Sequence, residues 1–235
     1  MARPQLGLAL LLALGVVPGA AQTPDPAWDV TKPRGTPKEI DFTTSEGTWM
    51  STDITPDGRW IVFNLLGHIY RVPGTGGTAE CLTEDTGIAM NYHPRISPDG
   101  STIAFISDRN GQANLWLMDI DGKNPRALTH EMAGRYHEPT WSPDGRYLVV
   151  RRIDAVNLFN SVIMMVHRDG GQGTTLVKIE NNMVPGTPKI SPDGRYLYYQ
   201  VSQGPVNGYF SRNDVMMGDV QIRRLDLRTG RTDHI

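Results

Sequence analysis

The chain has 235 residues, of which 39% are hydrophobic and 20% are charged, a composition that allows a globular protein with a sizeable core. Its net charge is −2 and its acidic and basic residues are interspersed, so the sequence has neither the basic block of a nucleic-acid-binding protein nor an acidic tail. Cys81 is the single cysteine, which excludes a disulfide within the chain and a metal cluster built on cysteines.

The first 21 residues have the pattern of a secretory signal peptide. Arg3 provides a positive start, the stretch 6–17 is apolar, and small residues lead to a predicted cleavage site after Ala21. The apolar stretch is shorter than the ~20 residues that a membrane-spanning helix needs. We therefore expect a periplasmic or secreted bacterial protein with no membrane span after cleavage, in which residues 22–37 form a linker.

A five-residue turn sequence occurs four times in the rest of the chain. It reads ITPDG at 54–58, ISPDG at 96–100, WSPDG at 141–145 and ISPDG at 190–194. Proline presets φ at the first central position of a tight turn, aspartate can bond the following backbone, and glycine accepts a positive φ. The motif therefore predicts a hairpin corner, and we assign its aspartates a structural role rather than a catalytic or metal-binding one.

The four turns recur at a period typical of β-propeller blades. They are separated by 42, 45 and 49 residues, counted between Asp57, Asp99, Asp144 and Asp193. Each repeat also contains four short apolar segments that predict strands. We therefore predict an all-β fold, a β-propeller of four-stranded antiparallel blades over 38–235, with blades at about 48–85, 90–130, 135–180 and 185–235.

The number of repeats predicts an incomplete ring of about four blades. Propellers have about 4 to 8 blades, so a closed four-bladed ring is the alternative. The segment 38–47 reads as a strand ahead of the first repeat, and Ile235 lies inside what should be the outermost strand of the fourth repeat. Because a repeat array normally has a finished terminal unit, we expect that the sequence is truncated at its C-terminus.

A proline precedes the turn at the same offset in three of the four repeats. These prolines are Pro94, Pro139 and Pro188. Proline suits the start of a strand, where no ladder donor is needed. The innermost strands of a propeller surround its central channel, so we predict channel-lining side chains at His93, Arg95, His137, Glu138 and Lys189. The alternative is that these five are surface polar residues at strand starts.

Two stretches resemble known propeller families. Residues 94–129, which include SPDG, DRNG, NLW and DGKNPRALT, follow the repeat of TolB-like propellers almost throughout. The stretch 42–83, with RRLDLRTG at 223–230, resembles more narrowly the N-terminal propeller of secreted bacterial amidohydrolase-family proteins. Similar repeats open tricorn-like proteases and prolyl-oligopeptidase relatives. The narrower resemblance implies a propeller that precedes a metal-dependent hydrolase barrel.

The chemistry of such a barrel is missing from the sequence. Those amidohydrolases bind metals with a His-x-His pair, which is absent here, and HEMAG (130–134) and HEPTW (137–141) lack the second histidine of a zinc-protease motif. Neither a G-x-S-x-G nucleophile turn nor a Walker-type loop occurs. We therefore predict no catalytic, cofactor-binding or metal-binding residue in this chain, and a metal only in a downstream hydrolase domain.

Two functions follow from these observations. The chain is either the propeller part of a larger hydrolase, which binds a protein, peptide or small molecule at its channel or gates substrate, or a stand-alone TolB-like periplasmic propeller. Nucleic acid is not expected as a partner. The long insertion at 201–221 is either variable filler or a contact with a following domain, and the basic residues of RRID at 151–154 read as solvated.

Overall fold

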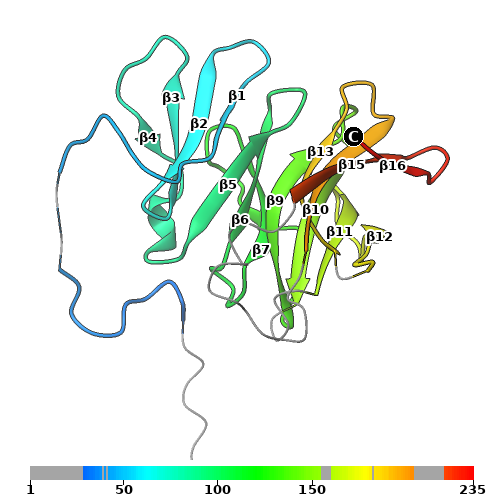
Figure 1. The fold of residues 1–235 in the computed structure, drawn as a ribbon. Helices are drawn as coiled ribbons and strands as arrows, with labels where there is room; N and C mark the ends of the chain where they lie inside the picture. Colours follow the sequence, from blue (N-terminus) through cyan, green and yellow to red (C-terminus); the bar gives the residue numbers. More distant parts are fainter. Residues whose placement is uncertain (1–28, 39, 41, 155–159, 182, 204–219) are drawn as a thin grey trace, which may run out of the picture.

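The computed structural model describes residues 29–38, 40, 42–154, 160–181, 183–203 and 220–235 (Figure 1). The predicted signal peptide, the start of the predicted linker and residues 204–219 of the predicted insertion lie outside the described residues. The described residues form sixteen β-strands and one 3-10 turn, Glu84–Thr86, with no α-helix among them. The prediction of an all-β fold is therefore confirmed.

The strands form four sheets, each built from four consecutive antiparallel strands in chain order. The first sheet consists of β1 (Thr52–Ile54), β2 (Trp60–Leu65), β3 (His68–Pro73) and β4 (Glu80–Cys81). The second consists of β5 (Asn91–Ile96), β6 (Thr102–Ser107), β7 (Asn114–Asp119) and β8 (Arg126–Ala127). The third consists of β9 (Gly134–Trp141), β10 (Tyr147–Asp154), β11 (Ser161–His167) and β12 (Thr174–Val177). The fourth consists of β13 (Met183–Ile190), β14 (Tyr196–Gln203), β15 (Val220–Asp226) and β16 (Thr232–His234).

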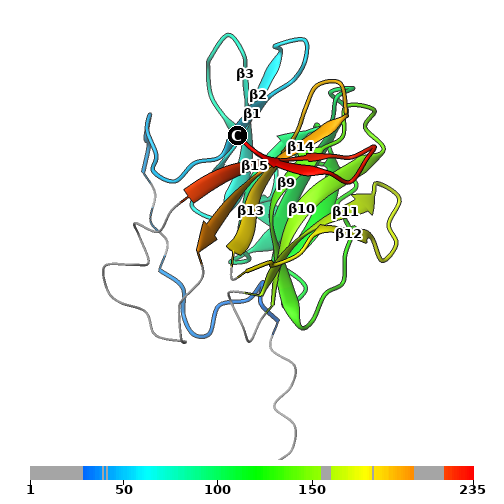
Figure 2. The same ribbon diagram turned by 45° about the vertical axis from the view of Figure 1, so that its right-hand side comes forward.

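The four sheets are arranged as propeller blades. The first strands of neighbouring sheets contact each other, β1 with β5, β5 with β9 and β9 with β13, so these four strands are the innermost ones. Figures 1 and 2 show the sheets following one another around this line of first strands. The described residues thus form an open arc of four blades, in agreement with the predicted incomplete ring.

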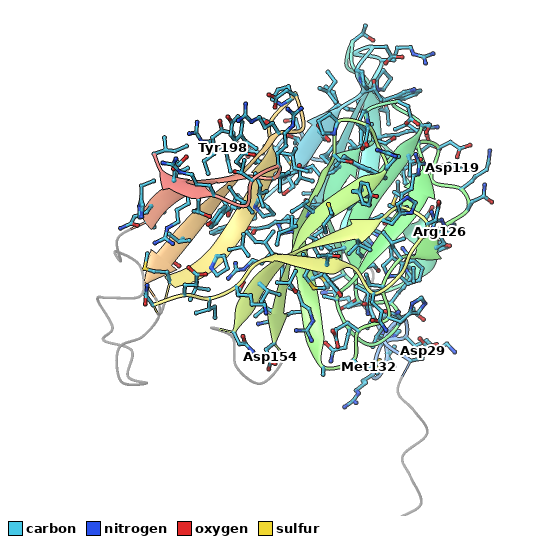
Figure 3. The ribbon with its side chains drawn as sticks, turned by 90° about the vertical axis from the view of Figure 1, so that its right-hand side faces the viewer. Asp29, Asp119, Arg126, Met132, Asp154 and Tyr198 are labelled. Carbon is cyan, nitrogen blue, oxygen red and sulfur yellow. The ribbon has the colours of Figure 1, made fainter. Side chains whose placement is uncertain are left out.

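Hydrophobic layers between neighbouring sheets hold the blades together (Figure 3, where Asp119 and Arg126 mark the outer part of the second blade and Tyr198 marks the fourth). Strand β6 is buried at every residue because side chains alternate along a strand and both of its faces are covered. Ile103 and Phe105 belong to the layer shared with the first blade, whereas Ala104 and Ile106 belong to the layer shared with the third. Burying a side chain of this size contributes roughly 1.5–3 kcal/mol, so each boundary between blades is strongly stabilised.

The repeated turn forms the corner between the first and second strands of every blade, as predicted. In the third blade the Ser142 hydroxyl donates to Asp144 Oδ1 at 2.6 Å, and the Arg146 N–H donates to the same oxygen at 3.1 Å. The hydrogen bond from Ser142 is the main cause that lowers the pKa of Asp144 to about 2. The equivalent hydroxyl and backbone bonds are made to Asp57, Asp99 and Asp193. All four carboxylates are therefore used within their own turns.

The turns of neighbouring blades also pack against each other. Each turn glycine has a positive φ, between 68° and 75°, which glycine adopts without strain. From the second blade onward, an added Cβ on this glycine would lie 3.5–3.8 Å from the Cδ atom of the preceding turn's proline, in the pairs Gly100–Pro56, Gly145–Pro98 and Gly194–Pro143. The four corners therefore form a continuous line of proline–glycine contacts from blade to blade.

The predicted strand ahead of the first repeat is not formed. The described residues of 38–47 have no strand conformation, and Ile40 and Phe42 are exposed. An alternating apolar pattern needs a neighbouring edge with free backbone groups before it becomes a strand. No such pairing involves this segment among the residues that the structure describes.

Candidate functional site

In three blades the innermost strand carries a β-bulge at the dipeptide that contains the recurrent proline. Two of its residues stand opposite one residue of the second strand at His93–Pro94, Glu138–Pro139 and Thr187–Pro188. The residue before each proline has a positive φ, 54° at His93, 55° at Glu138 and 47° at Thr187. A bulge of this kind changes the direction of its side chains. The prolines thus lie within the strands, and the prediction that they start strands is wrong.

The bulges link the second, third and fourth blades through hydrogen bonds. The N–H of Glu138 donates to His93 Nδ1 at 3.3 Å. The N–H of Thr187 donates to Glu138 Oε2 at 2.8 Å, and the Thr187 hydroxyl donates to Oε1 at 3.3 Å. A bulged N–H has left the regular ladder and needs another acceptor, which the side chain of the preceding blade supplies. Because Nδ1 of His93 accepts a hydrogen bond, this ring is neutral and carries its proton on Nε2.

Further hydrogen bonds connect the first three blades next to the bulges. The N–H of Ile96 donates to the Asp53 carboxylate at 2.8 Å, and the Arg95 guanidinium donates to the carbonyl of Thr52 at 3.3 Å. The indole N–H of Trp141 donates to the Arg95 carbonyl at 3.0 Å. The stretches 91–96, 134–141 and 183–190, together with Asp53 of β1 and Arg151 of β10 beside them, form one connected region, which we call the inner-strand surface.

Four cationic side chains belong to this surface or adjoin it, and neighbouring residues fix the position of Arg151. Strand pairing places Arg151 of β10 opposite His137 of β9. Its Nε donates to the Ser161 hydroxyl at 2.9 Å, and a Cβ at Gly186 would lie 3.4 Å from its Nη1, so glycine at this position leaves room for the guanidinium. The other three cations are Arg95 on β5, Arg135 on β9 and Lys189 on β13.

The surroundings of Lys189 and Arg151 disfavour their charge. Burial lowers the pKa of Lys189, and the positive charge of Arg95 lowers it further, whereas the carboxylates of Asp53 and Glu138 oppose the shift. Burial also lowers the pKa of Arg151, against the opposing effect of Glu138. The two carboxylates therefore offset the burial of the cations only in part.

Three aromatic rings complete the surface. The ring of Tyr92 lies 5.0 Å from that of His93 and 5.8 Å from that of His137, and the two imidazoles are 6.3 Å apart between centroids. Burial is the largest cause that lowers the pKa of His137 to about 4, and the charges of His93, Arg135 and Arg151 add to the effect. Burial likewise lowers the pKa of His93. Both imidazoles are therefore neutral at pH 7.

The five residues predicted to line a channel all lie on innermost strands, as His93 and Arg95 on β5, His137 and Glu138 on β9, and Lys189 on β13. The structure brings the two histidines and Glu138 into contact, and it places Arg95 close enough to Lys189 for its charge to lower the pKa of the lysine. Their role in lining a channel stays a prediction.

Sequence reasoning missed three members of this region: Asp53, Arg135 and Arg151. It assigned residues 151–154 to a solvated basic cluster, yet Arg151 is half-buried and pairs across the sheet with His137. The available signal was the alternation along β9, which places residues 135 and 137 on one face. The pairing partner on β10 could be identified only with the strand register.

The described residues contain no group of three or more His, Cys, Asp or Glu side chains placed to hold a metal ion. In the same part of the chain, no helix has the length and apolar character needed to cross a membrane. The region therefore offers charge, aromatic rings and hydrogen-bonding groups.

The comparison with protein families matches residues 47–209 to the model of the Tricorn protease N-terminal beta propeller domain. The chain belongs to this family. The match extends from the residues before β1 to the segment after β14, so it includes the whole inner-strand surface.

Curated relatives of this Tricorn-type propeller include peptidases and TolB proteins. Tricorn protease homolog 1 of Streptomyces coelicolor is 32% identical over 121 residues, which cover 52% of this chain and 11% of the relative. The Tol-Pal system protein TolB of Wolinella succinogenes is 26% identical over 169 residues, covering 69% and 39% respectively. Across four such relatives the chain spans between 11% and 49% of their length.

Solved structures show the same fold. TolB from Acinetobacter baumannii superposes with a TM-score of 0.58 at 20% identity, over 78% of this chain and 42% of that structure. The Tricorn protease superposes with a TM-score of 0.53 at 18% identity, over 83% and 18%. The predicted likeness to the fold of TolB propellers is thus confirmed, while the narrower likeness to propellers of amidohydrolases stays a prediction.

Proposed function

We propose that the chain is a non-catalytic β-propeller module that binds a protein or peptide over the inner-strand surface. The observation that carries this proposal is the series of bulges at His93, Glu138 and Thr187, which changes the direction of one polar side chain in each of three blades. Side chains from several blades thereby meet in one place, as a binding surface on a rigid scaffold requires.

The module would act as a recognition or gating part of a larger hydrolase. The likeness to Tricorn protease homolog 1 supports this, as does the uncharacterized peptidase YuxL of Bacillus subtilis, which is 50% identical over 148 residues covering 49% of this chain and 22% of the relative. These relatives favour a peptidase as the catalytic part. The amidohydrolase that the sequence of 42–83 predicts is the more specific form of the same proposal, and it would bring the metal in its own domain.

A stand-alone TolB-like binding protein is the second candidate, favoured by the match to TolB over 69% of the chain. The predicted signal peptide at 1–21 gives both candidates a periplasmic or secreted location. Reading the coding sequence beyond codon 235 separates them. A downstream segment with a hydrolase motif supports the first, and further propeller repeats followed by a stop codon support the second.

Binding is tested by nuclear magnetic resonance on the isotope-labelled chain, titrated with a set of short peptides of defined sequence. We expect shifted backbone resonances to concentrate in 91–96, 134–141 and 183–190. Shifts confined to outer strands such as β8 or β12, or no shift with any peptide, would refute the proposed surface. The same samples are assayed for cleavage of the peptides, and products formed by the purified chain would refute the non-catalytic role.

A further inference from the structure

The inner-strand surface has more cations than carboxylates. The surface has four cations, Arg95, Arg135, Arg151 and Lys189, and among the described residues the carboxylates that act on Lys189 and Arg151 are those of Asp53 and Glu138, while both histidines are neutral. Both carboxylates already accept backbone N–H groups, Asp53 from Ile96 and Glu138 from Thr187. Half-buried charges without a partner are costly, so this surface favours a ligand that brings negative charge.

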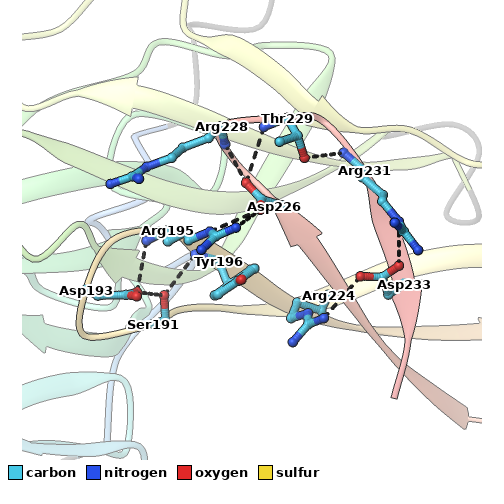
Figure 4. Close-up of polar contacts among 10 residues, drawn as sticks. All are labelled: Ser191, Asp193, Arg195, Tyr196, Arg224, Asp226, Arg228, Thr229, Arg231 and Asp233. Atoms are coloured by element: carbon cyan, nitrogen blue, oxygen red, sulfur yellow. Dashed lines mark hydrogen bonds and ion pairs between the residues drawn. The ribbon is translucent and has the colours of Figure 1, made fainter.

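Several arginines elsewhere among the described residues are paired with carboxylates. In the fourth blade Arg195 meets Asp226 at 2.9 Å, while Arg224 and Arg231 meet Asp233 at 3.1 and 3.0 Å (Figure 4). By contrast, none of Arg95, Arg151 and Lys189 has a carboxylate oxygen within 4.0 Å among the residues that the structure describes.

The neighbouring residue gives the sharpest contrast. Arg152 follows Arg151 in the sequence but points to the opposite face of β10, where its Nε meets Glu131 at 2.6 Å. Among the described residues Arg151 has no carboxylate partner on its own face, although Ser161 and Gly186 fix the position of its guanidinium. A guanidinium held in place with free N–H groups is prepared to bind two oxygens of a planar anion.

Buried polar atoms without a partner lie next to this guanidinium. Within the part of the chain that the structure describes, neither Nε2 of the His137 ring nor Nε of Arg135 on the same strand has a hydrogen-bond partner. Buried polar atoms are usually satisfied, so each exception indicates a group that is completed by something else. Arg151 lies opposite His137, which places these orphaned atoms beside the unpaired cations.

We propose that the inner-strand surface holds an oxyanionic group of its ligand, a carboxylate or a phosphate, with the side chains of Arg95, Arg151 and Lys189. This inference rests on the proposed binding function and specifies its ligand chemistry. Arg151 would take the two oxygens of the anion, and Lys189 and Arg95 would compensate its charge from β13 and β5.

The test is a calorimetric titration of the chain with four probes: inorganic phosphate, acetate, and one peptide selected by the binding experiment in two forms, with a free and with an amidated C-terminus. We expect phosphate, acetate and the peptide with a free C-terminus to bind. If the terminal carboxylate is the bound anion, amidation weakens binding of the peptide. If an acidic side chain is the bound anion, binding is weakened instead in a third form of the peptide, in which Asp and Glu are replaced by Asn and Gln.

The variants are Arg151→Gln and Lys189→Gln, matched by Arg59→Gln and Lys123→Gln, whose side chains lie on turns between strands and are 78% and 77% exposed. Each of the two variants of the inner-strand surface should lower the affinity for the charged probes at least about tenfold, since a hydrogen bond to a charged group contributes roughly 1.5–3 kcal/mol. Arg151→Lys retains the charge without the planar fork and should lie between wild type and Arg151→Gln. Thermal unfolding of every variant checks that it is folded.

The outcomes separate this inference from the function on which it rests. Peptide binding that survives amidation and the loss of acidic side chains supports a binding module and overturns the oxyanion site. Binding of phosphate or acetate without any peptide supports the oxyanion site and overturns the peptide ligand. Equal losses in the inner variants and in their matched controls also overturn the site.

Discussion

Lowering the pH from 7 to 5 is expected to destabilise the protein through His137. Its pKa falls from 6.5 to about 4 on folding, mainly because the ring is buried. Between these values the unfolded chain binds a proton that the folded chain does not, so stability is present above pH 6.5 and is lost as the pH falls toward 4. Linkage with these two values gives a loss of about 2 kcal/mol between pH 7 and pH 5.

The measurement is the free energy of unfolding from urea titrations at pH 7, 6 and 5, for the wild type and His137→Phe. Phenylalanine keeps a ring against Tyr92 and removes the titrating group, so the variant should lose less stability on acidification, with the remainder coming from His93. The turn aspartates, with pKa values of about 2 in three blades, titrate below this window. His130→Gln at an exposed position is the control, and a pH dependence of His137→Phe equal to that of wild type would refute the reasoning.

Two further predictions concern packing and backbone strain. Leu148→Ala removes a fully buried side chain from the layer between the second and third blades, so the free energy of unfolding should fall by about 2–5 kcal/mol, whereas Met132→Ala, at a side chain that is 71% exposed, should change it by less than about 0.5. Thr187→Gly should be more stable than Thr187→Val by about 1–2 kcal/mol in chemical denaturation, because both lose the hydroxyl and only glycine relieves the positive φ of 47°. Valine equal to or better than glycine would show that the bulge is not strained.

The blades and their corners could be predicted because their signals are local. The aspartate and glycine of each turn make hydrogen bonds to residues within the turn, as Asp144 and Gly145 do. The strands on either side show the usual alternation of inward and outward side chains. Each copy of the turn sequence therefore predicts a hairpin at its own position. The period of the turns then fixes the order of the sheets.

The bulges could not be predicted in the same way. The residue before a proline ordinarily has an extended backbone, whereas His93, Glu138 and Thr187 have a positive φ. The recurrence of x-Pro at one offset signalled a shared conformation, but which one depends on the register of the second strand and on an acceptor from the preceding blade. Arg151 shows the same limit, because its place beside His137 follows from strand pairing.

The line of proline–glycine contacts between corners bears on how the array changes length in evolution. At each boundary between the described blades, the proline of one corner lies against the glycine of the next. A duplicated segment that begins and ends at the same point of the repeat carries both residues of this packing pair, so it fits between any two blades. A deletion of half a repeat leaves one corner without its neighbour. Genes for such chains should therefore gain and lose DNA in whole-blade steps, with breakpoints free to fall anywhere in the repeat.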